Sequence, residues 1–173
     1  MNYEQSIDYI HSIPKFRRPL GNANLEKLLT HLDNPQKKLK FIHIAGTNGK
    51  GSTAAMTAEI LKKSGFKTGL FTSPYLEVFN ERIRINGENI TDNDLAEYVT
   101  RVKAIMKKNN ALVSEFAFIT AVSFLYFYEK QCDIVVLEVG MGGKLDATNV
   151  IDSSLVSVIC KIGLDHTQYL GNT

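Results

Sequence analysis

One short segment of the sequence has the composition of a phosphate-binding loop. Residues 46–53 read Gly-Thr-Asn-Gly-Lys-Gly-Ser-Thr, between an apolar run and an alanine-rich stretch that predict a strand and a helix. Glycines at such a turn let backbone N–H groups face an anion, and the helix N-terminus adds partial positive charge. Lys50 can then reach terminal phosphates, with a hydroxyl of Ser52 or Thr53 near a metal ion. We predict a phosphate-binding loop made of Gly46, Thr47, Asn48, Gly49, Lys50, Gly51, Ser52 and Thr53.

This loop departs from the strict nucleotide-binding pattern at two places. Ile44 occupies the position of the first glycine, and Gly51 separates Lys50 from Ser52. The alternative interpretation is a glycine-rich turn between a strand and a helix, with a lysine that faces solvent.

A carboxylate and a histidine stand at the ends of two further apolar runs. Glu138 follows the apolar residues 134–137, where an ionised carboxylate is costly unless it has a partner. An acid at such a strand end resembles the arrangement that holds Mg²⁺ in many phosphate-loop enzymes. His166 follows Asp165 after the last run. We predict that both bind metal. The alternatives are an acid that pairs with an arginine or caps a loop, and a hydrogen-bonded structural histidine.

The apolar pattern predicts the elements that position these residues. Strands are expected at residues 41–45, 68–72, 134–139 and 155–160, a hairpin at 81–90, and helices at 3–12, 25–32, 52–64, from Thr91 onward and at 116–130. This alternation predicts an α/β fold with a doubly wound, mostly parallel sheet and helices on both faces. Ligands bind at the carboxyl ends of such strands. The glycine loop, Thr72-Ser73, Glu138 and Asp165-His166 should therefore converge on one site.

Local signals add detail to this scheme. Asn86-Gly87 predicts the hairpin turn, and Thr91 with Asp94 predicts a reciprocal helix cap.

Residues 73–82 carry too many functional groups for a simple linker, although a mobile surface loop is the alternative. Polar residues 146, 148 and 149 follow a second glycine turn and could be plain turn residues. We interpret His11 and His31 as surface groups and His43 as a packed or loop-facing strand residue.

The composition is that of an ordinary globular protein with enough chain for one domain. Of its 173 residues, 44% are hydrophobic and 22% charged, and 20 Lys and Arg against 18 Asp and Glu leave a net charge of +2. This balance argues against nucleic acid or an anionic membrane as a partner.

Cys132 and Cys160 show no C-x-x-C spacing, so we predict buried free thiols of a reducing compartment. The N-terminus lacks the features of a signal peptide. We expect a cytoplasmic protein.

Five segments, read together, resemble the folylpolyglutamate synthase and dihydrofolate synthase family of the Mur ligase superfamily. They span residues 37–173 and read HIAGTNGKGST, GLFTSPYLEVFNERIRING, SEFAFITA, DIVVLEVGMGGKLDATNV and GLDHTQYLGNT. The resemblance implies the P-loop-type central domain of a Mur ligase. It also implies an ATP-dependent ligase that turns the carboxylate of a folate or of dihydropteroate into an acyl phosphate, which the amine of L-glutamate then attacks.

The resemblance also implies roles for individual residues. Lys50, Glu138 and His166 would be catalytic, and Ser73, Glu138 and His166 would bind Mg²⁺, with a monovalent cation as a further option. Residues 48–52 would hold ATP. The loop of Arg82 would become ordered when substrate binds. The substrate site would comprise Arg82, Ser114, Glu115, Phe116, Ala117, Leu145, Asp146 and Ala147.

Some features of the family are absent from these residues. Ala117 stands where relatives usually carry a glutamate that contacts the pterin, and Lys144 stands where many carry arginine. A carbamylated lysine and the C-terminal glutamate-ligase domain of the family have no counterpart before Thr173. We therefore expect residues 1–173 to form an incomplete ATP-binding domain with an uncovered last strand, weak nucleotide binding and no ligation. The alternatives are a stand-alone nucleotide-binding module that acts by conformational change, and a peptidoglycan-precursor ligase.

Overall fold

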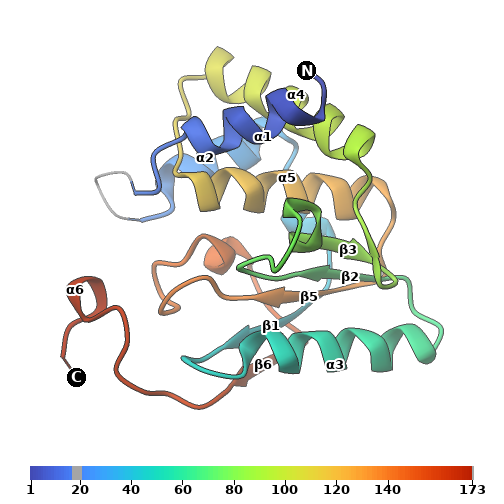
Figure 1. The fold of residues 1–173 in the computed structure, drawn as a ribbon, viewed down its shortest axis with the longest axis vertical. Helices are drawn as coiled ribbons and strands as arrows, with labels where there is room; N and C mark the ends of the chain where they lie inside the picture. The colour runs from blue at the N-terminus through green and yellow to red at the C-terminus, as the bar shows by residue number, and fades with distance from the viewer. Residues whose placement is uncertain (17–20, 173) are drawn as a thin grey trace.

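The computed structural model describes residues 1–16 and 21–172 and contains a six-stranded sheet in the order β4-β3-β2-β5-β1-β6 (Figure 1). Strands β2, β5, β1 and β6 run parallel, and the β3–β4 hairpin joins the edge of β2 in the antiparallel sense. The elements are α1 Tyr3–Ser12, α2 Ala23–His31, η1 Pro35–Lys38, β1 Phe41–Ala45, α3 Lys50–Lys63, β2 Thr68–Phe71, η2 Phe79–Arg82, β3 Ile83–Ile85, β4 Glu88–Asn89, α4 Asp92–Lys108, α5 Glu115–Glu129, β5 Ile134–Glu138, η3 Ala147–Val150, β6 Val156–Ile159 and α6 Thr167–Leu170.

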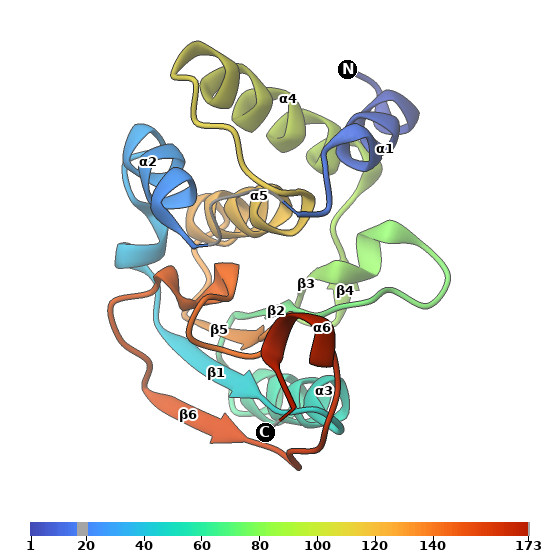
Figure 2. The same ribbon diagram turned by 90° about the vertical axis from the view of Figure 1, so that its left-hand side faces the viewer.

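Helices cover both faces of the sheet, as the alternation of strands and helices predicts. Figures 1 and 2 show α3 on one face and α1, α2, α4 and α5 on the other. The face with four helices holds the large core cluster, which includes Phe41, Phe71 and Phe124, whereas the α3 face holds a small cluster around Ile44 and Ala54. The predicted doubly wound α/β fold is confirmed.

Helix α5 forms a middle layer, and this explains its sequence. It lies against the sheet and carries α1, α2 and α4 on its outer side (Figure 1). A helix covered all around needs apolar side chains on every side. Every residue of α5 from Ala117 to Phe127 is buried. The predicted deeply packed helix at residues 116–130 is thus confirmed, and its N-terminus is held at one edge of the fold.

Most predicted boundaries agree with the structure, with a few differences. Helix α3 begins at Lys50 rather than at Ser52, so the lysine of the loop belongs to the first helical turn. The Thr91 hydroxyl accepts from the Asp94 amide at 3.1 Å, but the Asp94 carboxylate pairs with Lys130 instead of returning to the cap. The turn Asn86-Gly87 has φ angles of 51° and 85°, as the predicted hairpin turn requires.

Strand β6 forms one edge of the sheet, and three of its four residues are exposed. The exposed fraction of Ile159 is 73%, and Leu155 and Val156 are also exposed. The expectation of an uncovered last strand is confirmed for these residues. Cys132 is buried, as predicted, but Cys160 is only half-buried because it follows this edge strand. In residues 1–16 and 21–172, no helix has both the length and the apolar character needed to cross a membrane.

Candidate functional site

The loop between β1 and α3 leaves backbone donors free at a helix N-terminus. Gly49 occupies the N-cap position with a φ of 85°, and among the described residues no side chain caps this end of α3. The first N–H groups of a helix have no partner within the helix. The ammonium of Lys50 folds over the same loop and donates to the carbonyls of Gly46 at 2.8 Å and Thr47 at 3.3 Å. Donors and positive charge therefore gather where phosphate was predicted.

The other end of the loop is tied to the segment that follows β6. The amides of Thr47 and Asn48 both donate to the carbonyl of Lys161, at 2.9 and 3.3 Å. The Thr47 hydroxyl also contacts the backbone of Gly163. The amides of Thr47 and Asn48 thus hold the loop in place, and the free donors are those of the first turn of α3. The predicted phosphate contacts of this loop are therefore left to the N–H groups at the start of α3 and to Lys50.

Close packing beside this loop explains one of its glycines. Gly46 has a φ of 141°, and a Cβ atom placed there would lie 2.8 Å from Cβ of Cys160. Any larger residue would have to displace the segment after β6. The Thr53 hydroxyl, predicted near a metal ion, lies 3.4 Å from Sγ of Cys160. Thr53 therefore contacts the protein in this structure rather than facing an open site.

Glu138 lies where three of the four segments predicted to form one site come together: the glycine loop, Thr72-Ser73 and the end of β5. Its exposed fraction is 3%, at the end of the central strand β5. Its Oε2 accepts from the Ser73 amide at 2.8 Å, and its Oε1 lies 3.6 Å from the position that a Cβ of Gly51 would occupy. Burial raises the pKa of Glu138, against the effects of the Ser73 amide and of the charges of Lys50 and Arg82. The carboxylate is thus a costly buried charge that a bound cation would compensate.

The remaining predicted metal ligand, His166, is an exposed residue at the start of a short helix. It precedes α6 with a φ of 47°, its side chain is half exposed, and the nearest acid is Asp165 at 3.9 Å. In the part of the chain that the structure describes, no three His, Cys, Asp or Glu side chains form a group that could hold a metal ion. The structure brings Ser73 and Glu138 together, and the metal role of His166 stays a prediction.

A large cleft opens beside Glu138 and collects the predicted substrate residues. Its volume is about 930 Å³. It lies among α1, α2, the segment 73–82, the N-terminus of α5, the loop after β5 and α6. Ser73 and His166 also line it. The predicted substrate residues that line the cleft are Arg82, Ser114, Glu115, Phe116, Ala117, Leu145, Asp146 and Ala147, which is the complete predicted set.

Arg82 forms a cationic wall of this cleft. Its guanidinium lies over the rings of Tyr75, at 5.3 Å, and Phe79, at 5.2 Å. Its buried Nε has no hydrogen-bond partner among the described residues. Burial lowers the pKa of Arg82 from its high ordinary value, and the charges of Glu115 and Glu138 oppose that effect. A buried donor without a partner is unfavourable unless a ligand supplies the acceptor.

The segment that precedes Arg82 is folded around one carboxylate. Both carboxylate oxygens of Glu81 accept from backbone amides of the same segment, those of Leu76, Glu77 and Val78, at 2.8 to 3.0 Å. These three bonds lower the pKa of Glu81. The Glu81 carboxylate thus folds this segment back on itself, and both its ordering on substrate binding and the alternative of a mobile surface loop stay predictions.

Two of the predicted substrate residues also have a structural task. Ser114 caps α5 by accepting from the Ala117 amide at 3.4 Å. Asp146 accepts from the Met141 amide at 2.8 Å and from the hydroxyl of Thr148 at 2.6 Å, and it is almost fully buried. The alternative of plain turn residues is thus partly right, because the Asp146 carboxylate stabilises the loop that lines the cleft.

Sequence reasoning missed several residues of the cleft. His11, at the end of α1, pairs with Glu115 at 3.3 Å and packs edge-on against Phe79 at 5.8 Å. It was interpreted as a surface group because an isolated histidine at a helix end carries no local signal. The other lining residues that no motif pointed to include Lys15, Asn22, Tyr75, Phe79 and Tyr169.

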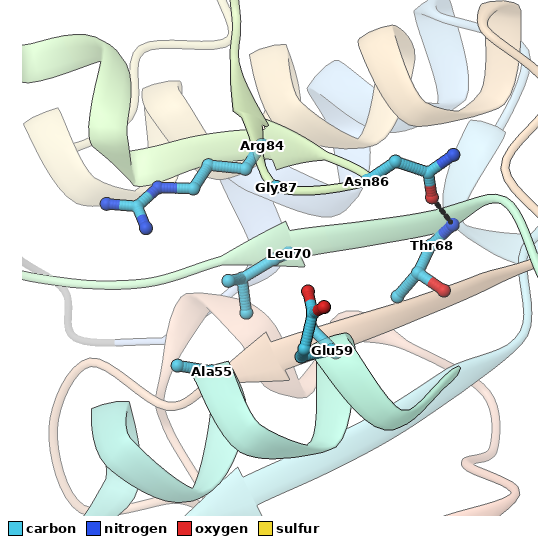
Figure 3. Close-up of a pocket in the computed structure, with 8 residues that line it drawn as sticks. Ala55, Glu59, Thr68, Leu70, Arg84, Asn86 and Gly87 are labelled. Atoms are coloured by element: carbon cyan, nitrogen blue, oxygen red, sulfur yellow. Dashed lines mark hydrogen bonds between the residues drawn. The ribbon is translucent and has the colours of Figure 1, made fainter. Parts of the chain in front are cut away.

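A second cavity lies far from this chemistry. It measures about 120 Å³ and is enclosed by α3, β2 and the β3–β4 hairpin, with Glu59 and Arg84 on opposite sides (Figure 3). The Thr68 amide beside it donates to the Asn86 side chain at 2.8 Å. Both its small volume and its position away from the carboxyl ends of the strands separate it from the site.

Comparisons with known proteins find a matching family model and several relatives. The family model of the Mur ligase middle domain matches residues 44–173. The chain is 43% identical to the folylpolyglutamate synthase of Lacticaseibacillus casei, over 100% of this chain and 41% of that protein. It is 41% identical to the dihydrofolate synthase/folylpolyglutamate synthase of Bacillus subtilis, over 99% of this chain and 41% of that protein. The chain thus spans about two fifths of the length of these relatives.

Solved structures show the same fold. A complex of FPGS with AMPPCP and folate has a TM-score of 0.95 and 43% identity, and the match covers 100% of this chain and 43% of that one. A complex of E. coli FolC with ADP and without folate substrate has a TM-score of 0.89 and 30% identity, with 99% of this chain and 40% of that one covered.

Proposed function

The chain belongs to the Mur ligase family, and from this premise we propose that it forms the ATP- and folate-binding part of a ligase that adds L-glutamate to a folate. The proposed substrate is a reduced folate, dihydropteroate or both. Relatives that carry the names folylpolyglutamate synthase and dihydrofolate synthase support the proposal, as do solved relatives with AMPPCP and folate or with ADP.

The single observation that carries the proposal is the composition of the large cleft. All eight predicted substrate residues line it, together with Ser73 and His166 of the predicted metal set. Glu138 lies beside it, accepts from the Ser73 amide and is close to Gly51 of the phosphate loop. We infer a nucleotide site beside a second substrate site, as transfer of a phosphoryl group between two bound molecules requires.

The proposed reaction has two steps. A carboxylate oxygen of the folate attacks the γ-phosphorus of ATP, the bond to the β-phosphate oxygen breaks, and an acyl phosphate and ADP form. The amine of L-glutamate then attacks the acyl carbon, and the tetrahedral intermediate loses phosphate and a proton to give the amide. A carboxylate needs this activation because its own oxygen is a poor leaving group, whereas phosphate is a good one.

The residues of the chain supply the electrostatic part of this chemistry. The free N–H groups at the start of α3 and the ammonium of Lys50 would bind the phosphates and stabilise charge on the transferred group. Oxygen ligands suit Mg²⁺, and the buried Glu138 carboxylate with the neighbouring Ser73 fits such an ion. Glu138, Ser73 and the predicted ligand His166 would hold it, and bound Mg²⁺ supplies charge neutralisation between the two anionic substrates.

We propose in addition that residues 1–173 are the incomplete ATP-binding domain of this ligase. The relatives are more than twice as long, and the last strand of the sheet is uncovered. A further domain of the full-length protein would complete the nucleotide and glutamate sites. A nucleotide-dependent switch alone has no need of the second cleft, and the segment Gly142 to Asn149 resembles the folate ligases rather than the peptidoglycan ligases.

The test is release of ADP by the full-length protein. We expect release only when a folate substrate and L-glutamate are both present, with dihydropteroate and tetrahydrofolate compared in parallel. ADP release without a folate, or none with either substrate, would overturn the proposal.

A further inference from the structure

The loop that follows β5 is held by a chain of hydrogen bonds that begins on β1. His43 of β1 lies with its Nε2 at 2.8 Å from the hydroxyl of Thr148. That hydroxyl donates to Oδ1 of Asp146 at 2.6 Å, and the Thr148 amide donates to the same oxygen at 2.9 Å. The other oxygen of Asp146 accepts from the Met141 amide at 2.8 Å. Three side chains thus connect the central sheet to the wall of the large cleft.

The direction of these bonds follows from the donors available. A carboxylate only accepts hydrogen bonds, so the single proton of the Thr148 hydroxyl points to Asp146. The hydroxyl oxygen must then accept from His43, and this requires a proton on Nε2. Thr148 is fully buried and Asp146 nearly so, so that water does not replace either bond at low cost.

Burial keeps the first member of this chain neutral. His43 is half-buried within β1, and burial lowers its pKa, while the charge of Asp146 acts in the opposite direction. The neutral ring carries one N–H, so the position of that proton decides whether His43 donates to Thr148. The geometry places it on Nε2.

We propose that His43 and Thr148 are positioning residues for the folate, because they orient Asp146 and with it the wall of the cleft at residues 140–147. This inference deepens the proposed function and rests on it. Asp146 and Ala147 line the cleft, and Gly140 lies so close to Asp146 that a Cβ atom there would be 3.0 Å from Oδ2. Loss of the Thr148 hydroxyl would leave Asp146 with fewer donors in a tightly packed loop.

Steady-state kinetics of the full-length protein test the proposal. Thr148→Val keeps the shape of the side chain and removes its hydroxyl, and His43→Leu removes the ring donor. We expect either variant to raise KM for the folate about tenfold, the effect of a lost hydrogen bond to a charged group, and to leave KM for ATP within about twofold. The double variant should be no worse than Thr148→Val alone, because both changes break the same chain of bonds.

Conservative variants and a matched control separate positioning from general damage. Thr148→Ser keeps a hydroxyl, His43→Gln keeps an N–H donor, and both should retain a near-normal KM for the folate. Thr68→Val removes an equally buried threonine hydroxyl far from the cleft and should change neither KM. An unchanged folate KM in Thr148→Val, an equal rise in both KM values, or a failure of Thr148→Ser to restore binding would overturn the proposal.

A spectroscopic measurement keeps this test independent of ligation. Nitrogen-15 NMR of histidine in the wild-type protein should show His43 as the neutral Nε2–H tautomer, and Thr148→Val should alter its signal. A proton on Nδ1 in the wild type, or an unaltered signal in Thr148→Val, would overturn the inference even if the protein ligates glutamate. Absence of folate-dependent ADP release from the wild type would instead overturn the proposed function.

Discussion

Two glycine loops follow neighbouring strands of this sheet, and they are built on different principles. The loop at residues 46–51 leads into α3, leaves the helix N-terminus uncapped and presents backbone donors. The loop at residues 140–143 leads into no long helix, and the buried side chains of Asp146 and Thr148 hold it. The shape of the first loop and its free donors depend on glycine conformation and on one lysine. The shape of the second loop depends on every side chain of a buried hydrogen-bond network.

The two loops meet at Glu138. Its carboxylate lies close to Gly51 of the first loop, and Val139 alone separates it from the second loop. Under the proposed function, the nucleotide would bind at the first loop, the folate at the second and the metal ion at the boundary between them. Substitutions on either side should therefore affect different substrates.

The largest effect should come from Lys50→Ala in the first loop. Loss of a charge-assisted contact to phosphate should lower kcat/KM at least about 100-fold and abolish measurable Mg-ATP binding by calorimetry. Lys63→Ala, at the exposed end of the same helix, is the matched control and should bind ATP normally. Unchanged ATP binding in Lys50→Ala would mean that the first loop is not the nucleotide site.

Glu138→Gln tests the boundary between the loops. The side-chain oxygen of the new glutamine can still accept a hydrogen bond from the backbone N–H of Ser73. Because the variant also carries no buried charge, its free energy of unfolding should stay equal or rise. Mg²⁺-dependent ADP release should nevertheless fall about 100-fold. Glu129→Gln, which breaks a partly exposed ion pair with Arg101, should have the opposite pattern of normal activity and slightly lower stability. Normal magnesium dependence in Glu138→Gln would remove Glu138 from the metal site.

A pair of glycine variants should separate the two substrates. In Gly46→Ala the new Cβ would lie 2.8 Å from Cys160, and in Gly140→Ala it would lie 2.6 Å from the ring of Phe116. Each clash should destabilise the protein by about 1 to 3 kcal/mol. We expect Gly46→Ala to raise mainly KM for ATP and Gly140→Ala to raise mainly KM for the folate. Gly163→Ala, with open space around the new atom, is the control. Equal effects on both KM values would contradict the division between the loops.

The smallest expected effect is the contribution of His43, which supports the second loop, to the pH dependence of the free energy of unfolding. Burial places the pKa of His43 below its ordinary value of 6.5, so the unfolded chain binds a proton more readily than the folded one. The free energy of unfolding should therefore be highest above pH 6.5 and fall as the pH decreases through the folded-state pKa. His43→Gln should flatten this dependence by roughly 1 kcal/mol or less. Denaturant unfolding at a series of pH values measures it, and an equal slope in both proteins would contradict the assignment.

Much of the site could be predicted from local sequence. Phe41–Ala45 was predicted with the observed boundaries because a short apolar run between charged and glycine-rich residues has few other stable conformations. Glu138 was found because an acid that ends an apolar strand is conspicuous. The predicted substrate residues came instead from a family resemblance, and no local pattern would have grouped Arg82 with Leu145.

Other contacts had no local signal at all. His11 meets Glu115, the side chain of Asn22 donates to the carbonyl of Asp146, and the carbonyl of Lys161 fixes the first loop. Each joins residues from elements that are far apart in the chain, so that neither partner is unusual in its own surroundings. The cytoplasmic location and the metal role of His166 stay predictions.

The sequence by itself determined the succession of strands and helices along the chain, the glycine-rich start of α3 and the acid at the end of β5, because periodicity, glycine placement and burial cost act over a few residues. Only the tertiary structure decided that the Thr47 and Asn48 amides donate to Lys161 and that Asp146 is held from β1 through Thr148 and His43. It also decided that all eight predicted substrate residues line the same cleft. Those outcomes depend on which strands become neighbours. That choice is made by packing of the whole core and not by any single segment.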